Sequence, residues 1–154
     1  MHDVLIAGAG PAGITAAVYS ARKKLDTIII TPDVGGQAAW SADIENYTGF
    51  QFITGPDLVE KFREHVSSYE SIQVRENESV KCINHAKDHF KVMTGQGEYM
   101  ARTVIVATGR RPRSLGIPGE EEFKNKGVTY CATCDGPLFS GMQVAVVGGG
   151  NSAL

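Results

Sequence analysis

The sequence has little of what membrane, secreted and nucleic-acid-binding proteins need. No apolar run approaches the about 20 residues of a membrane-spanning helix, and no basic stretch precedes an apolar one at the N-terminus, as a signal peptide requires. The 15 lysines and arginines are balanced by 17 acidic residues, and a formal net charge of -2 creates no basic field for nucleic acid or an anionic membrane. We therefore expect a cytoplasmic globular protein that binds neither nucleic acid nor membrane.

Cysteine is also scarce, with three residues in the whole chain. An odd number, without a secretion signal, argues against a disulfide framework and favours redox or metal chemistry for the pair Cys131-x-x-Cys134. A structural zinc site needs about four Cys or His ligands, and no histidine shows a paired spacing near a cysteine, so we expect no metal. Cys82 shares a predicted strand with Val80 and Ile83, and we expect it to be a buried structural thiol.

Glycine, in contrast, is frequent and clustered, which indicates backbone close to a ligand. The first cluster, Gly8-x-Gly10-x-x-Gly13, follows an apolar strand at 3–7 and opens a helix at 14–24, after which a β-branched strand spans 27–31. This order predicts a βαβ unit with parallel strands. The glycines allow a tight turn, approach to a pyrophosphate and helix–strand packing, and the positive helix N-terminus attracts the phosphates. A merely structural tight turn is the alternative.

The second strand departs from the usual dinucleotide pattern at its end. An acidic residue there normally binds the ribose, but this sequence has Thr31, with Asp33 two residues further on. A threonine hydroxyl can also bond a ribose, although more weakly than a carboxylate. The motif alone therefore leaves the identity of the dinucleotide open.

The remaining pattern defines the predicted architecture. A long connection at 32–56 precedes a helix at 56–69, whose apolar stripe contains Leu58, Val59, Phe62 and Val66. Short strands at 72–74, 80–85, 90–94 and 99–106 form an antiparallel meander that returns to the main sheet. We predict an α/β, three-layer Rossmann-like domain with an antiparallel β-meander over residues 1–110. A linker at 111–119 and the start of a second dinucleotide-binding domain at 120–154 follow.

The cysteine pair has two possible placements. At the start of a helix, its spacing puts both sulfurs on one face within disulfide reach, and the helix amides favour a thiolate. Alternatively, Gly136-Pro137 makes the helix begin near Pro137, and the pair lies just before it. Asp135 is positioned to relay a proton to or from a thiol. Two inert buried thiols are the alternative, which the polar, turn-like surroundings disfavour.

A second glycine-rich turn, Gly148-x-Gly150-x-x-Ala153, follows a predicted strand at 143–147. We interpret it as the start of a nicotinamide-dinucleotide site. The residue that would distinguish NADH from NADPH lies about 20 positions further on, outside this sequence.

Two dinucleotide motifs with a cysteine pair just before the second resemble the low-molecular-weight thioredoxin reductases. The flavoprotein component of alkyl hydroperoxide reductase shares this module, and Gly136 to Phe139 lean slightly towards it. The matching strings occur in the family's order and span all 154 residues. They are Gly8–Gly13, Gly35-Gly36-Gln37, Glu45-Asn46-Tyr47, Ala107-Thr108-Gly109, Cys131–Gly136 and Val146–Ala153.

The resemblance implies a set of roles. FAD would be bound by Gly8, Gly10, Pro11, Ala12, Gly13, Thr31, Gly35, Gly36, Gln37, Asn46, Ala107, Thr108 and Gly109. Cys134 would face the flavin, Cys131 would attack the partner's disulfide, and Asp135 would be the acid–base group. Gly148, Gly150 and Ala153 would belong to the NADH or NADPH site.

The resemblance also implies a thioredoxin-like partner and a homodimer. Family members are about twice as long as this sequence, so FAD binding without turnover is an alternative for these 154 residues. A flavin oxidase that uses oxygen is a third hypothesis.

Overall fold

The computed structural model describes residues 1–41, 43–124, 126–150 and 153, and leaves the side chains of Thr133 and Cys134 undescribed. The chain divides into two compact units, Met1–Gly109 and Arg110–Leu154. Among the described residues, no helix combines the length and the apolar character needed to cross a membrane.

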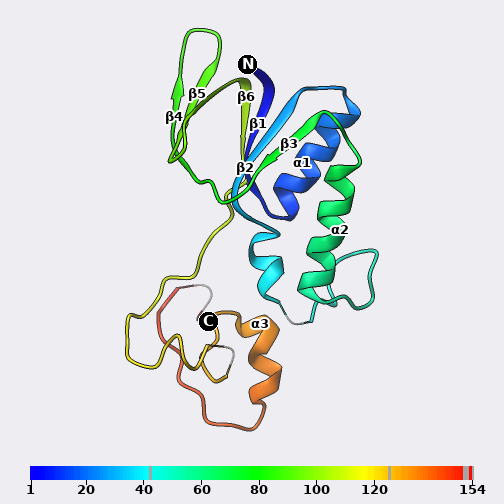
Figure 1. The fold of residues 1–154 in the computed structure, drawn as a ribbon. Helices are drawn as coiled ribbons and strands as arrows, with labels where there is room; N and C mark the ends of the chain where they lie inside the picture. Colours follow the sequence, from blue (N-terminus) through cyan, green and yellow to red (C-terminus); the bar gives the residue numbers. More distant parts are fainter. Residues whose placement is uncertain (42, 125, 151–152, 154) are drawn as a thin grey trace. The chain divides into compact units, whose positions relative to one another are not determined.

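The predicted βαβ unit opens the first unit (Figure 1). It consists of β1 (His2–Ala9), α1 (Pro11–Arg22) and β2 (Thr27–Val34). The strands pair in parallel, with Val4 opposite Thr27 and Ala7 opposite Ile30. The middle of each strand, residues 4–7 in β1 and 28–30 in β2, is apolar and buried, as expected where both faces of a sheet are covered.

The long connection after β2 contains a short 3-10 helix, η1 (Gly36–Trp40), and an isolated bridge between Ile44 and Ile53. The next helix, α2 (Gly55–Ser67), begins at Thr54, whose hydroxyl oxygen accepts the N–H of Asp57 at 3.2 Å. On its predicted apolar stripe Leu58, Phe62 and Val66 are buried, and Val59 is partly buried.

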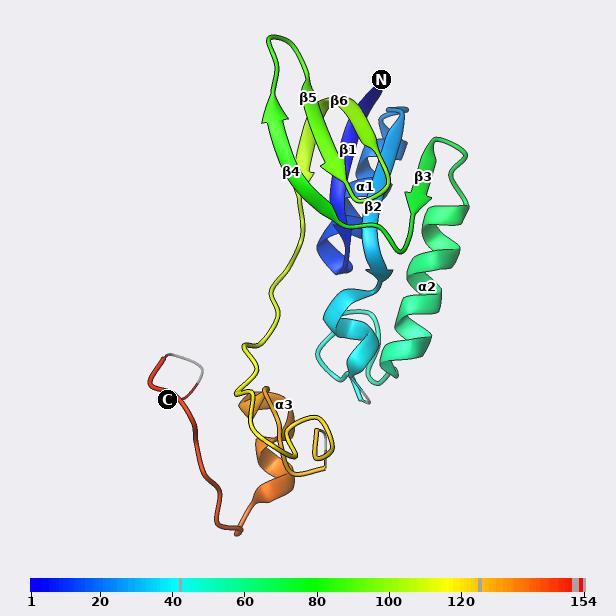
Figure 2. The same ribbon diagram turned by 60° about the vertical axis from the view of Figure 1, so that its left-hand side comes forward.

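The antiparallel meander is also present. Its strands are β4 (Val80–His85), β5 (Phe90–Thr94) and β6 (Glu98–Val106), and β3 (Ile72–Arg75) adds a parallel strand beside β2. One sheet results, in the order β3-β2-β1-β6-β5-β4. The first part of β6 pairs with β5, and its second part pairs in parallel with β1. β6 therefore connects the meander to the parallel strands (Figure 2).

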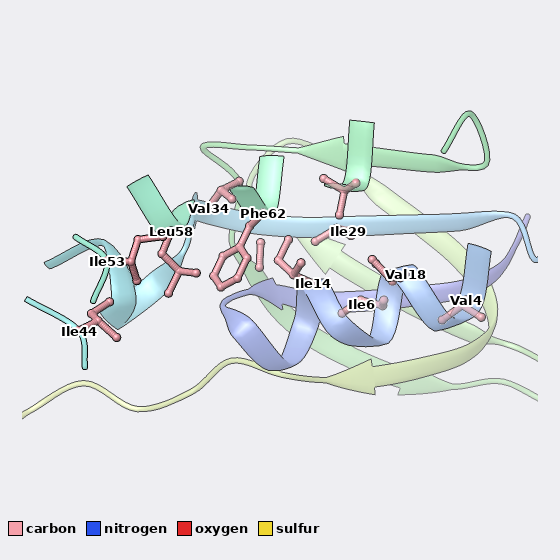
Figure 3. Packing of buried hydrophobic residues seen from close by; sticks show 13 residues of the cluster. Val4, Ile6, Ile14, Val18, Ile29, Val34, Ile44, Ile53, Leu58 and Phe62 are labelled. Carbon is pink, nitrogen blue, oxygen red and sulfur yellow. The ribbon is translucent and has the colours of Figure 1, made fainter. Parts of the chain in front are cut away.

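Two apolar cores follow from the alternation of side chains along β1 and β2. Ile6 and Ile29 point towards α1 and α2, where they join Ile14, Leu58 and other residues of one cluster (Figure 3). The intervening residues point to the opposite face: Leu5, Ile28 and Ile30 pack there with Val92 of β5 and Ala101 of β6. Helices, parallel strands and meander are the three layers that the sequence predicted.

The expected burial of Cys82 is wrong. Cys82 is exposed, and its thiol lies 3.5 Å from the side-chain oxygen of Asn84. β4 is an edge strand, and its register shifts between Val80 and Cys82, which lie opposite Thr94 and Met93. The chain thus advances two residues along β4 while it advances one along β5, which is a β-bulge. The bulge turns the side chain of Cys82 away from the core-facing side of the sheet, on which Val80 lies.

The second unit contains the one-turn helix α3 (Ala132–Asp135) and the 3-10 helix η2 (Gly136–Phe139). The strand predicted at 143–147 is not formed, and Val144, Val146 and Val147 are 63%, 66% and 66% exposed. A strand requires a neighbouring strand for its backbone hydrogen bonds, and none of the described residues pairs with this segment.

Candidate functional site

The first glycine turn joins β1 to α1, and two of its glycines relieve backbone crowding. Gly8 has φ +104°, and a Cβ there would lie 2.4 Å from the carbonyl oxygen of Ala107. A Cβ on Gly13 would lie 1.9 Å from the carbonyl oxygen of Gly8. Neither position accepts a side chain, because Gly8 lies directly against Ala107, the residue that follows β6, and Gly13 lies directly against the backbone of Gly8.

Gly10 differs, because a Cβ there would meet only the carbonyl oxygen of Gly35, at 4.0 Å. Gly10 is the N-cap of α1, Pro11 occupies the first turn, and no side chain of the described residues caps this end. The first N–H groups of the 12-residue helix α1 therefore have no side-chain cap among the described residues, and the space beside Gly10 is open. Such an end of a helix binds phosphate oxygens through its N–H groups and its positive dipole.

The loop after β2 approaches the same turn. Gly35 and Gly36 have φ +101° and +54°, and a Cβ on Gly36 would lie 3.6 Å from the Cα of Gly10. The N–H of Gly35 donates to the carbonyl of Ala9 at 2.8 Å. A Cβ on Gly35 would lie 2.2 Å from a methyl group of Val59 on α2. The two glycines thus place the loop between the phosphate-type turn and α2, and Gln37 follows in η1.

Thr31 forms bonds inside the fold. Its hydroxyl accepts the N–H of Ala9 at 3.2 Å and donates to the carbonyl of Asp33, and the residue is 2% exposed. The β1–β2 register shifts here, between Ala7 and Ala9. Thr31 therefore bridges the irregular ends of β1 and β2, and its single proton is used within the chain. Towards a ligand the hydroxyl retains only the capacity to accept.

The other predicted cofactor residues are distributed around this turn. The N–H of Ala107 donates to the carbonyl of Ala7 at 2.8 Å. The Cα of Thr108 lies 3.2 Å from the Cβ position of Gly8, and Gly109 ends the first unit. Asn46 is exposed in the loop closed by the bridge between Ile44 and Ile53, and its role at the cofactor stays a prediction.

The cysteine pair follows the first of its two predicted placements. Cys131 directly precedes α3, Cys134 lies within it, and Pro137 is in the separate helix η2. The N–H of Asp135 donates to the carbonyl of Cys131 at 2.9 Å, which closes one helical turn. The side chain of Cys134 lies outside the described residues.

Thr129 connects both ends of this turn. Its hydroxyl accepts the N–H of Cys131 at 3.2 Å and donates to a carboxylate oxygen of Asp135. The predicted acid–base residue is therefore oriented by a side chain that precedes the cysteines. Sequence reasoning missed Thr129, although a hydroxyl residue two positions before a turn is a common side-chain-to-backbone motif.

Sequence reasoning also missed Glu120, which is 3% exposed. Its carboxylate accepts the hydroxyl of Tyr130, the N–H groups of Leu115 and Gly116 at 2.8 and 2.7 Å, and the hydroxyl of Ser114 at 2.8 Å. These bonds, led by that from Tyr130, lower the pKa of Glu120 to about 2. The bond to Glu120 in turn raises the pKa of Tyr130 to about 12. No local sequence pattern predicts a carboxylate that accepts hydrogen bonds from four such donors.

The second glycine turn is exposed. A Cβ on Gly148 or Gly150 would meet nothing within 4 Å, and the carbonyl of Gly150 accepts the N–H of Ala153 at 2.8 Å. Asn151, Ser152 and Leu154 lie outside the described residues. The nicotinamide site expected from Gly148, Gly150 and Ala153 therefore stays a prediction.

Residues 2–154 match the family described as pyridine nucleotide-disulphide oxidoreductase. The chain belongs to this family. The description of the family names a pyridine nucleotide, which is a dinucleotide. The open, uncapped N-terminus of α1 at Gly10 fits the phosphates of such a dinucleotide.

Individual members of the pyridine nucleotide-disulphide oxidoreductase family match along the whole chain. A thioredoxin reductase of Bacillus subtilis (strain 168) is 44% identical over 155 residues, covering 100% of this chain and 48% of that protein. An NADH dehydrogenase of the same organism is 45% identical over 153 residues, covering 99% of this chain and 30% of that protein.

A solved structure, thioredoxin reductase from Streptococcus pyogenes, aligns with TM-score 0.81 and 44% identity over 90% of this chain and 45% of that one. The predicted Rossmann-like fold is thereby confirmed. The chain spans about half the length of the thioredoxin reductases that it matches.

Proposed function

We propose that this chain is the front part of a flavin-dependent disulfide reductase of the thioredoxin reductase type. The observation that carries the proposal is the turn from Cys131 to Asp135. Two cysteines bracket one helical turn, and a carboxylate at its end is oriented by Thr129. The thioredoxin reductases that match the whole chain at 44% identity support the same reading.

The FAD site is proposed at the turn between β1 and α1. The open space at Gly10 admits the pyrophosphate, and the first N–H groups of α1 bind its oxygens. Gly35 and Gly36 bring the loop of Gln37 beside the turn, and Ala107 and Thr108 border it from the end of β6. When bound, FAD supplies the transfer of electrons between a pyridine nucleotide and the dithiol.

The cysteines carry the exchange with the substrate disulfide. The Cys131 thiolate attacks one sulfur of a partner disulfide, which forms a mixed disulfide and releases the other sulfur as a thiolate. Cys134 then attacks the sulfur of Cys131, so that the Cys131–Cys134 disulfide forms and the partner leaves with both thiols reduced. Asp135 delivers the proton that a released thiolate needs.

The partner would be a small thioredoxin-like protein, and the electron donor NADH or NADPH. A cytoplasmic location suits this chemistry, because reduced dithiols persist in reducing compartments. A homodimer is also proposed, on the resemblance alone. The competing assignment is the flavoprotein component of alkyl hydroperoxide reductase. The match to a protein called NADH dehydrogenase is compatible with an electron acceptor other than thioredoxin.

The test measures disulfide reduction with a chromogenic aromatic disulfide and NADPH or NADH. It is made on this chain and on a longer version with a complete nucleotide domain. In the longer version, Cys131→Ser or Cys134→Ser should abolish reduction and leave the bound flavin intact. Cys82→Ser is the matched control, because Cys82 is exposed on β4 and distant in sequence from Cys131 and Cys134. This variant should not change the rate of reduction. Full reduction in either variant would overturn the proposal.

FAD binding without turnover is the second candidate for these 154 residues. The exposure of Val144, Val146 and Val147, which pair with no described strand, favours it. A flavin absorption band without disulfide reduction by this chain would support that candidate, whereas turnover by the chain itself would refute it. Peroxide formation with oxygen as the only acceptor would instead indicate an oxidase.

A further inference from the structure

The carboxylate of Glu120 joins three parts of the second unit. One oxygen accepts the N–H of Leu115 and the hydroxyl of Tyr130, and the other accepts the hydroxyl of Ser114 and the N–H of Gly116. Each oxygen therefore has two donors, which is the arrangement that holds a buried carboxylate in one orientation. Three of the four donors belong to residues 114–116.

The fourth donor belongs to the residue that directly precedes the cysteine pair. Tyr130 directly precedes Cys131, and its hydroxyl is the only one of the four groups in that segment. The next restraint along the chain is Thr129, which accepts the N–H of Cys131 and donates to Asp135. Two side chains thus restrain the segment that leads into the turn. Glu120 accepts the hydroxyl of Tyr130, and Thr129 accepts the N–H of Cys131.

We propose that Glu120 is a positioning residue for the Cys131/Cys134 dithiol, and that it acts through the hydroxyl of Tyr130. The proposal rests on the function proposed above and adds a residue outside the dithiol to it. A disulfide closes only within a narrow range of Cα and Cβ separations. Holding the backbone at Cys131 therefore raises the effective concentration of one sulfur at the other.

This restraint persists while the thiols change their charge. The pKa of Glu120 is about 2 and that of Tyr130 about 12, whereas cysteine thiols titrate near about 8.5. Glu120 therefore remains an ionised acceptor, and Tyr130 remains a protonated donor, over the whole range in which the dithiol reacts.

The sharpest variant is Tyr130→Phe, which removes one hydroxyl and keeps the ring. Ser114→Ala is its matched control, because it also removes one hydroxyl donor from the same carboxylate, at 2.8 Å, but not the one next to Cys131. If Glu120 only stabilises the loop, the two variants behave alike. If Glu120 positions the dithiol, only Tyr130→Phe changes the redox equilibrium of the cysteines.

The equilibrium is measured in glutathione buffers, on chains that carry Cys82→Ser so that only the pair reacts. On closing, Cys131 and Cys134 lose two electrons and two protons, and one glutathione disulfide becomes two glutathione thiols. Alkylation and mass measurement count the molecules with two thiols or none. Hydrogen exchange at Leu115 checks that Glu120 still accepts its N–H. Gly116 is unsuitable for this check, because its N–H also lies 3.2 Å from the hydroxyl that Ser114→Ala removes.

We expect Tyr130→Phe to lower the closing equilibrium constant about three- to tenfold, and Ser114→Ala to leave it unchanged. Equal constants for the two variants, with the exchange rate of Leu115 unaltered, would overturn the positioning role and leave the proposed function standing. Failure of the unsubstituted pair to close at any glutathione ratio would overturn both.

Discussion

Replacing Thr31 by valine tests whether this residue serves as a bridge between β1 and β2. Valine has nearly the same shape and suits a strand, so the change removes the hydroxyl without opening a cavity. Ala9 is 1% exposed, and its N–H loses its acceptor, which costs about 1–3 kcal/mol in free energy of unfolding. Loss of the bond to the carbonyl of Asp33 adds about 1 kcal/mol. We therefore expect Thr31→Val to destabilise the first unit by about 3 kcal/mol.

Thr31→Ser is the matched control, because it keeps the hydroxyl and loses one buried methyl group, at about 1 kcal/mol. Trp40, the chain's single tryptophan, lies in η1 and reports unfolding of the first unit by its fluorescence. With a urea slope of about 1.5 kcal/mol/M, the unfolding midpoint should fall by about 2 M for valine and about 0.7 M for serine. If the valine variant unfolds at the same urea concentration as the unsubstituted chain, and the serine variant unfolds at a lower one, Thr31 acts by apolar packing instead.

Three further changes test other parts of the structure. Gly10→Ala should cost about 1 kcal/mol or less yet remove flavin from the purified chain, whereas Gly13→Ala should cost at least about 3 kcal/mol because its Cβ meets backbone at 1.9 Å; equal urea midpoints would contradict this. Glu76→Gln removes the ion pair between Glu76, whose side chain is 35% exposed, and Arg63 of α2. The free energy of unfolding should therefore change by under about 1 kcal/mol, and a larger loss would contradict this. Glu120, whose pKa is lowered to about 2, contributes stability above its ordinary pKa of 4.5 that is lost as pH falls towards 2. Tyr130, with its pKa raised to about 12, contributes stability below pH 10 that is lost as pH rises towards 12. Burial and the bond to Glu78 also raise the pKa of Tyr99, so ultraviolet titration should show late-ionising tyrosines of which the one at about pH 12 is absent in Tyr130→Phe.

The elements of the first unit were predictable because their signals are local. The apolar run before Gly8 and the β-branched run up to Thr31 indicate parallel strands wherever they occur. The stripe through Leu58 and Phe62 indicates one buried helical face in the same way. In the second unit, the strand predicted around Val146 is not formed, because a strand is stabilised by its neighbours and no described neighbour is present.

The roles of individual residues were harder to predict, because each depends on a contact between distant parts of the chain. The spacing of Gly8, Gly10 and Gly13 predicts a phosphate-type turn. It does not reveal that a Cβ would collide at the first and third positions and not at the second. The bulge between Val80 and Cys82 likewise reverses a face that strict alternation assigns to the core.

The sequence by itself therefore determined the order of elements in the first unit and the turn before α1, because chain stiffness, apolar period and glycine content act over a few residues. Only the tertiary structure decided what the side chains do. Thr31 bonds Ala9 across two strands, and Glu120 gathers donors from residues 114 to 130. Such bonds form only when folding brings separate segments within about 3 Å, and a buried polar group is retained when those partners are present.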